Sequence, residues 1–215
     1  MTFTGEVRQV DDVAEAFADL VVERAPRSVA LSGGGTARDC YAALARRRSD
    51  WSQVEVFIGD ERFVPVSDPD SNEGMIRAVL TDVVGARALH SMATAGATAE
   101  EAAAAYDAEI QAFGPIDLVH LGLGPDGHTA SIFPGSPTLD VTDRLVVTAG
   151  DDQHPHPRIT FTYPAIARGA LVVVTVAGTE KRDAFARVRA GDESLPATRV
   201  RAPEVIWLVD AAAAG

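Results

Sequence analysis

The sequence predicts an α/β fold, in which a mostly parallel sheet is flanked by helices within a single domain. Strand-like and helix-like segments alternate along the whole chain, a pattern typical of parallel strands joined by crossover helices. Several strand-like runs, such as residues 171–176, are almost continuously apolar, as expected for strands that are covered on both faces. The chain has 215 residues and no internal repeat or linker-like stretch, so one domain over residues 1–215 is expected.

The first half of the chain contains two predicted helices with clear signals. Residues 11–24 repeat apolar side chains at the spacing of one helix face. A second helix is expected to begin at Thr36, because Thr36 and Asp39 have the spacing of a capping box. The other predicted elements of this half are strands over residues 29–31 and 54–58, a polar loop over 59–72 and a helix over 73–80.

The second half continues the alternation. Thr98 and Glu101 are expected to open a helix that runs to about Phe113. The final residues, 211–215, are predicted to be a frayed tail. The remaining predicted elements are strands over residues 117–121, 145–148, 159–162, 171–176 and 205–209, and a helix over 179–189.

Composition disfavours several classes of partner. The chain has 19 basic and 31 acidic residues and a net charge of −12, so no nucleic-acid partner is expected, since phosphate backbones need a basic footprint. No apolar run approaches the roughly 18 residues of a membrane span, and no signal peptide is evident. The single cysteine, Cys40, favours a reducing compartment, and a cytoplasmic location is therefore expected. Only one of the basic residues, Lys181, is a lysine.

Chemically distinctive loops follow several predicted strands. In open α/β sheets, ligands bind beyond the carboxyl ends of the strands. The first such loop is SGGGT, residues 32–36. Its glycines would let backbone N–H groups approach an anion at a helix N-terminus; the alternative is a tight turn with a capping threonine. No Gly-Lys-Ser/Thr follows, so a small phosphate ester is favoured over a nucleoside triphosphate.

The loop after residue 121 reads GLGPDGH. Its glycines match a dinucleotide fingerprint, but Asp126 would face the pyrophosphate, and Pro134 and Pro137 interrupt the long helix that should follow. His128 suits general acid–base chemistry near neutral pH, with Asp126 to orient it. The alternative is a structural histidine.

The loop after residue 58 carries Asp60, Glu61 and Arg62. Arg62 could hold a phosphate in its bidentate fork, and Asp60 could order Arg62 or a sugar hydroxyl; the alternative is a solvated ion pair. Helix capping is expected of Asp70 and Ser71.

Two other site types are disfavoured. The cluster Asp151, Asp152, His154 and His156 matches no standard zinc spacing, so no metal is expected. A serine hydrolase is not indicated, because no Gly-X-Ser-X-Gly elbow occurs. Ser131 lies near His128 in the sequence, but capping or backbone contact is the expected role of its hydroxyl.

Five stretches, in order, resemble the 6-phosphogluconolactonase family. They are SGGGT (32–36), GDERFVPVSDPDSN (59–72), LGLGPDGHTASIFPGSP (121–137), PRITFTYPAI (157–166) and AGTEKRDAF (177–185). The resemblance spans roughly residues 29–201. It implies a Rossmann-like sheet and a reaction that needs no metal or cofactor. The chain departs from the family at the first loop, which often reads Ser-Gly-Gly-Ser-Thr-Pro, whereas this chain has Gly35 and Ala37.

The same resemblance implies hydrolysis of 6-phospho-D-glucono-1,5-lactone to 6-phosphogluconate in the oxidative pentose phosphate pathway. The partner is then a small phosphorylated sugar lactone. His128 is implied as the general base on water, with Asp126 tuning it. Asp60 is also implied as a catalytic residue, which either contacts the substrate or braces Arg62. The resemblance also implies that one positive pocket binds the phosphate end of the substrate. The implied substrate-binding residues of this pocket are Gly33, Gly34, Gly35, Thr36, Arg62, Arg158 and Lys181.

Alternatives from other functional classes stay open. Glucosamine-6-phosphate deaminases share the fold, but that family typically has Asp-Glu-Tyr in place of residues 60–62 and a glutamate after the histidine loop, where this chain reads Ser-Ile-Phe-Pro. A non-catalytic sugar-phosphate sensor would carry a DNA-binding module, for which the chain leaves no room. An inactive oligomeric scaffold is a third possibility, and the sequence leaves a monomer and a small homo-oligomer equally open.

Overall fold

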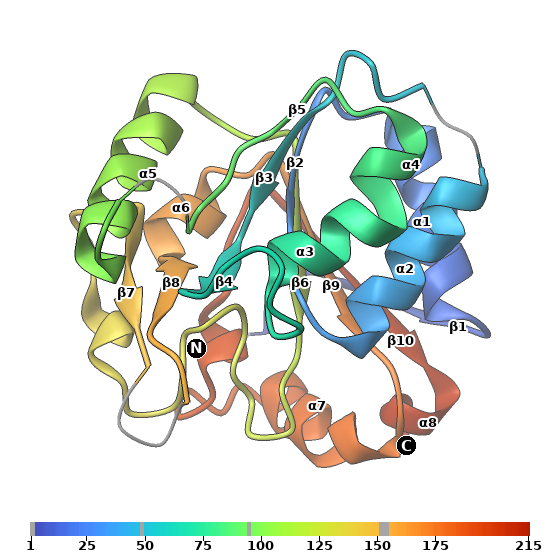
Figure 1. Cartoon of the computed structure of the whole chain (residues 1–215). Helices are drawn as coiled ribbons and strands as arrows, with labels where there is room; N and C mark the ends of the chain where they lie inside the picture. Colours follow the sequence, from blue (N-terminus) through green and yellow to red (C-terminus); the bar gives the residue numbers. More distant parts are fainter. Residues whose placement is uncertain (1–2, 48–49, 94–95, 151–154) are drawn as a thin grey trace.

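A seven-stranded parallel sheet forms the centre of the molecule (Figure 1). The computed structural model describes residues 3–47, 50–93, 96–150 and 155–215. The strand order is β1-β10-β9-β6-β2-β3-β5, and every pairing in this sheet is parallel. The strands are β1 (Glu6–Val10), β2 (Ser28–Leu31), β3 (Glu55–Ile58), β5 (Ala88–Leu89), β6 (Leu118–Gly122), β9 (Leu171–Val176) and β10 (Glu204–Asp210).

Three further strands form a small antiparallel sheet beside the main one. They are β4 (Asp60–Arg62), β7 (Val146–Ala149) and β8 (Arg158–Phe161), in the order β4-β8-β7. The prediction of a mostly parallel sheet is confirmed for the main sheet, but the strands expected near 145–148 and 159–162 belong to this second sheet. The segment 59–72, predicted as a loop, begins with a strand, and Arg62 pairs with Arg158 in the register of β4 and β8.

Helices cover both faces of the main sheet (Figure 1). α1 and α2 lie together on one face, whereas α5 lies at the opposite side and packs against β7 and β8. A π-helical turn, Arg77–Thr81, joins α3 to α4, and short 3-10 turns occupy Pro137–Asp140, Thr179–Lys181 and Pro196–Arg199. The α-helices are α1 (Val13–Arg24), α2 (Gly35–Arg46), α3 (Asn72–Ile76), α4 (Asp82–Val84), α5 (Ala99–Phe113), α6 (Tyr163–Ala167), α7 (Arg182–Arg189) and α8 (Ala211–Ala214).

The helix termini test the capping predictions. Thr98 caps α5 by accepting from the Glu101 N–H, and Ser71 caps α3 in the same way through Gly74. The capping box predicted at Thr36 is wrong, because α2 begins one residue earlier and Gly34 is its N-cap, with no side-chain cap. The tail predicted to fray is instead α8, since Asp210 caps it and Ala213 is buried.

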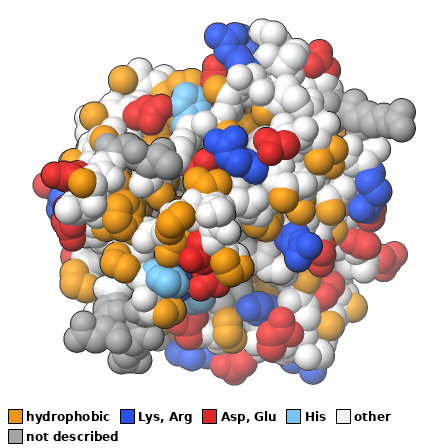
Figure 2. Space-filling model, viewed as in Figure 1, with side chains coloured by type: hydrophobic (Ala, Val, Ile, Leu, Met, Phe, Trp, Pro, Cys, Tyr) orange, Lys and Arg blue, Asp and Glu red, His pale blue; other side chains and the backbone are white. Residues whose placement is uncertain are grey.

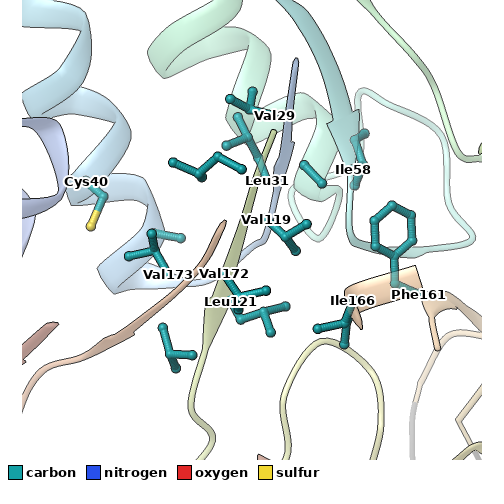
Figure 3. Close-up of a cluster of buried hydrophobic side chains, with 14 of the residues drawn as sticks. Val29, Leu31, Cys40, Ile58, Val119, Leu121, Phe161, Ile166, Val172 and Val173 are labelled. Atoms are coloured by element: carbon teal, nitrogen blue, oxygen red, sulfur yellow. The ribbon is translucent and has the colours of Figure 1, made fainter. Parts of the chain in front are cut away.

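The core consists of the apolar strands and the helix faces that cover them. All six residues of β9 are buried, as the continuous apolar run predicts. Figure 3 shows the two faces of the sheet: Val29 and Val173 lie on the side of Cys40 of α2, whereas Val119 and Leu121 lie on the side of Ile166 and Phe161. No helix in the described part of the chain is long and apolar enough to cross a membrane.

We expect Cys40 to be unreactive towards a disulfide reagent while the protein is folded. Its side chain is fully buried, and this burial, with the nearby charge of Asp39, raises the pKa of the thiol to about 12. At about pH 8 the reactive thiolate is therefore scarce. The reaction of Cys40 with the reagent, measured by absorbance, should occur only when urea unfolds the chain. Complete labelling within seconds in plain buffer would contradict this packing.

Candidate active site

The loops after β2, β3 and β6 meet beyond the carboxyl edge of the main sheet and enclose two adjoining hollows. Both hollows share one wall, formed by Gly33, Gly34, Gly122 and His128. We call the first the arginine hollow; its other lining residues include Asp60, Arg62, Asn72, Ala130 and Arg158. We call the second the lysine hollow; its other lining residues include Gly35, Thr36, Gly124, Thr175 and Lys181.

We call residues 32–36 the glycine loop. It forms part of the shared wall because the chain turns sharply from β2 into α2. Gly34 has a φ of 98°, a conformation that favours glycine, and it is the N-cap of α2. No side chain caps the N–H groups that follow it. The first turn of α2 therefore presents backbone donors at the positive end of a helix dipole, beside the hollows. The alternative of a turn capped by Thr36 does not hold.

His128 is held by Asp126. The Nδ1 atom of His128 lies 2.6 Å from Asp126 Oδ1, and the His128 N–H donates to the same oxygen at 3.2 Å. Gly124 permits this arrangement, because a Cβ there would lie 2.2 Å from Nδ1. Nε2 has no hydrogen-bond partner among the described residues and is the nitrogen left to act on a ligand. With a third of its side chain exposed, His128 is not a core histidine.

The charge state of Asp126 suits this orienting role. Burial raises its pKa, but the charge of His128 and the hydrogen bonds from His128 lower it further, so its net pKa lies below the usual value. The carboxylate therefore stays ionised and favours a proton on His128 Nδ1. Nε2 is then available as a proton acceptor.

Two arginines face the arginine hollow from neighbouring strands. Arg62 and Arg158 are opposite each other across β4 and β8, and the Nε atom of each is buried without a hydrogen-bond partner. Burial, and then the charge of Arg62, lowers the pKa of Arg158. Two like charges with unused donors indicate a site for an oxygen-rich or anionic ligand.

Asp60 contacts the histidine loop and does not brace Arg62. The buried Asp60 carboxylate accepts a hydrogen bond from Ser131 Oγ at 2.7 Å, whereas Arg62 Nη1 donates to the Asp70 carbonyl. The expectation that the Ser131 hydroxyl makes a capping or backbone contact is thus wrong. The solvated Asp60–Arg62 ion pair considered above does not form either. Asp60 also lines the arginine hollow.

Glu61, to which the sequence assigns no separate role, holds the loop that carries Arg62. Its buried carboxylate accepts from the backbone N–H groups of Arg62, Asn72 and Glu73, at 2.7, 2.8 and 2.7 Å, and from the Ser71 hydroxyl at 3.1 Å. Burial raises the pKa of Glu61 although all these bonds lower it. In the sequence Glu61 is one acid within a polar segment, which does not reveal its burial.

Lys181 lies apart from the two arginines. It ends the 3-10 turn after β9 and lines the lysine hollow, whereas Arg62 and Arg158 line the arginine hollow. The structure therefore brings the predicted residues to one site but separates the three cations that were expected to share a single pocket. On the face shown in Figure 2, acidic and basic side chains are interspersed.

The possible metal cluster is only partly described. Asp151, Asp152 and His154 lie outside the described residues, and His156 Nε2 lies 3.2 Å from Asp70 Oδ2. Within the described ranges, no group of three or more His, Cys, Asp or Glu side chains is arranged to hold a metal ion.

Comparison with known proteins places this chain in a family. A family model described as glucosamine-6-phosphate isomerases/6-phosphogluconolactonase matches residues 7–207. A 6-phosphogluconolactonase from Synechocystis is 41% identical over 204 residues, which cover 88% of this chain and 84% of that protein. The crystal structure of 6-phosphogluconolactonase from Thermotoga maritima has a TM-score of 0.85 at 28% identity, covering 96% of this chain and all of the other.

A second enzyme shares the fold. A monomeric glucosamine-6-phosphate deaminase superposes with a TM-score of 0.84 at 18% identity, covering 97% of this chain and 98% of the other. At that identity the likeness shows the fold alone. Residues of the site, and not the backbone, must distinguish the two reactions.

We expect Glu61→Gln to lower the free energy of unfolding by about 2–4 kcal/mol. Each carboxylate oxygen of Glu61 accepts two hydrogen bonds, and an amide nitrogen in place of one oxygen would leave two buried donors without an acceptor. Urea unfolding followed by circular dichroism measures this. Glu100→Gln, at an exposed position of α5, is the matched control and should change stability by less than about 0.5 kcal/mol. A Glu61 variant as stable as this control would show that the loop is held by other contacts.

Proposed function

The chain belongs to the glucosamine-6-phosphate isomerase/6-phosphogluconolactonase family, and we propose that it hydrolyses 6-phospho-D-glucono-1,5-lactone to 6-phosphogluconate. Three relatives that carry the name 6-phosphogluconolactonase are 41%, 37% and 36% identical and match most of the chain. The observation that carries the proposal is the His128–Asp126 pair at the junction of two cation-lined hollows. The substrate has two ends, a phosphate and a lactone, and the site has two matching regions.

The phosphate end belongs in the lysine hollow. There the first turn of α2, the Thr36 hydroxyl and the Lys181 ammonium can all donate to phosphate oxygens. The described residues that line this hollow include no carboxylate, whereas Asp60 lines the arginine hollow. A phosphate dianion beside Asp60 would be repelled, so electrostatics favours the lysine side. This refines the expectation that all three cations bind the phosphate.

The lactone end then lies towards the arginine hollow, with its carbonyl beside His128. A water molecule gives a proton to His128 Nε2 while its oxygen attacks the carbonyl carbon. The unused N–H donors of Arg62 and Arg158 stabilise the developing oxyanion. The bond from the carbonyl carbon to the ring oxygen breaks, and the imidazolium returns the proton to that oxygen. Asp60 accepts a hydrogen bond from a sugar hydroxyl.

Several broader properties follow from the same proposal. Residues 1–215 act as one catalytic domain, since residues as far apart as Gly33 and Lys181 contribute to one site. The partner is a small phosphorylated sugar lactone, held without a metal or cofactor. The enzyme works in the cytoplasm, where the lone Cys40 stays reduced.

We expect His128→Ala to lower kcat by about 10²–10⁴-fold with little change in KM, because the base acts in the transition state. Asp126→Asn should also lower kcat, since an amide no longer favours the reactive tautomer. The measurement is release of 6-phosphogluconate from freshly generated lactone, corrected for spontaneous hydrolysis. His90→Ala, which removes a histidine outside the site, is the control. Near-normal turnover by His128→Ala would show that this residue is not the general base.

Ammonia release from glucosamine 6-phosphate by the wild-type protein would instead indicate a deaminase.

We expect Lys181→Ala to raise KM by about 10–100-fold, the effect of losing one charge-assisted contact, and to weaken competitive inhibition by inorganic phosphate. Arg158→Gln should mainly lower kcat and leave phosphate inhibition nearly unchanged. Arg182→Ala removes the neighbouring cation, which does not line the lysine hollow, and serves as the control. If Arg158→Gln abolishes phosphate inhibition and Lys181→Ala does not, the two ends of the substrate are reversed.

A further inference from the structure

A buried polar network lies directly behind the glycine loop, and the proposed reaction does not use it. Tyr41 of α2, His120 of β6 and Thr175 of β9 are almost completely buried. Tyr41 Oη lies 2.8 Å from His120 Nδ1, and His120 Nε2 lies 2.9 Å from Thr175 Oγ1. Burying three polar side chains is unfavourable unless each is hydrogen-bonded, and apolar residues would fill the same space without that requirement. We therefore ask what these hydrogen bonds hold in place.

The network ends on the backbone of Ser32. Tyr41 Oη accepts from the Ser32 N–H at 2.8 Å and donates to the Ser32 carbonyl at 2.9 Å. The Ser32 hydroxyl donates to the His120 carbonyl at 2.5 Å. All three polar groups of Ser32 are thus occupied by Tyr41 and His120. Ser32 is the residue from which Gly33 and Gly34 continue, so its position decides where the N–H groups of the glycine loop point.

Donor accounting identifies the tautomer of His120. The single hydroxyl proton of Tyr41 is donated to the Ser32 carbonyl, so Tyr41 Oη can only accept from His120. His120 must therefore carry its proton on Nδ1, and Nε2 must accept from the Thr175 hydroxyl. If the proton were on Nε2 instead, Nδ1 could only accept. The Tyr41 hydroxyl could then donate to Nδ1 and leave the Ser32 carbonyl facing an acceptor, or donate to that carbonyl and leave Nδ1 facing an acceptor. One tautomer satisfies every group in the network.

The surroundings keep His120 in this state. The Phe17 ring lies 4.2 Å from the imidazole, centroid to centroid, and covers it on the helix side. Burial lowers the pKa of His120 to about 3, so the ring is neutral at physiological pH. A neutral imidazole with one N–H is the species that the donor accounting requires.

We propose that Tyr41 and His120 are positioning residues, which fix Ser32 and thereby hold the glycine loop in its anion-binding conformation. The inference rests on the proposed function in one respect, namely that this loop receives the substrate phosphate. A run of three glycines is costly to order, and a loop that is already held binds its ligand without that cost. Ser32 borders the arginine hollow and Thr175 the lysine hollow, so the network extends beneath both.

The test compares variants that differ in one hydrogen bond. Tyr41→Phe removes the hydroxyl that binds Ser32, and His120→Leu removes the imidazole donor. His120→Asn has a side chain of similar size to leucine and places an N–H donor near the position of Nδ1. We expect the first two to raise the dissociation constant for inorganic phosphate and the KM for the lactone by about 10-fold or more, with kcat within about 3-fold. His120→Asn should recover most of the loss.

Phe17→Leu is the matched control, because it disturbs the packing of the same cluster and removes no hydrogen bond. Equal weakening of phosphate binding by Phe17→Leu, or unchanged binding by Tyr41→Phe and His120→Leu, would overturn the proposal. Nuclear magnetic resonance of ¹⁵N-histidine provides an independent readout. A proton on Nδ1 of His120 is expected, and a proton on Nε2 would contradict the donor accounting.

Calorimetry with inorganic phosphate separates this inference from the proposed function. If the wild-type protein binds phosphate but does not hydrolyse the lactone, the proposed reaction fails, and the variants still test the network. If the wild-type protein does not bind phosphate, the loop is not an anion site, and the positioning role is overturned with it.

Discussion

Parallel pairing of β2 with β3 on one side and with β6 on the other determines where every group of the site lies. Leu31 is in register with Ile58, and Val29 with Leu118, so the three strands deliver their loops to one edge of the sheet. The glycine loop, the Asp60–Arg62 segment and the His128 loop are therefore neighbours, although about 30 to 90 residues separate them in the chain. Buried hydrogen bonds then set their fine positions: Glu61 holds one loop, and Tyr41 with His120 holds another.

Much of this arrangement could be predicted from the sequence, and the reasons are local. Continuous apolar runs such as β9 indicate buried strands, and glycines with polar residues after a strand indicate a loop at the carboxyl edge of the sheet. His128 and Asp126 are two residues apart, so their contact follows from the loop itself. The motif order also indicated the family correctly.

Other features depend on distant contacts that periodicity does not encode. The strands β7 and β8 have the same apolar character as the parallel strands, so their membership of a second sheet was not predictable. The pairing of Arg62 with Arg158 follows from that sheet. β1 is mostly polar, with only Val7 and Val10 apolar, and β5 has two residues, so neither gives a strong strand signal. The helical tail α8 forms because Asp210 caps it and Ala213 packs inside.

The separation of the cations changes how an acidic protein could bind an anionic substrate. A net charge of −12 disfavours a polyanion, yet a single phosphate meets only the local field of the glycine loop and Lys181. The most direct test of this account is a crystal structure with 6-phosphogluconate bound. We expect the phosphate within hydrogen-bond distance of the α2 N-terminus and Lys181, and the carboxylate between His128 Nε2 and the guanidinium groups of Arg62 and Arg158. A phosphate bound by the two arginines, or a carboxylate out of reach of His128, would contradict it.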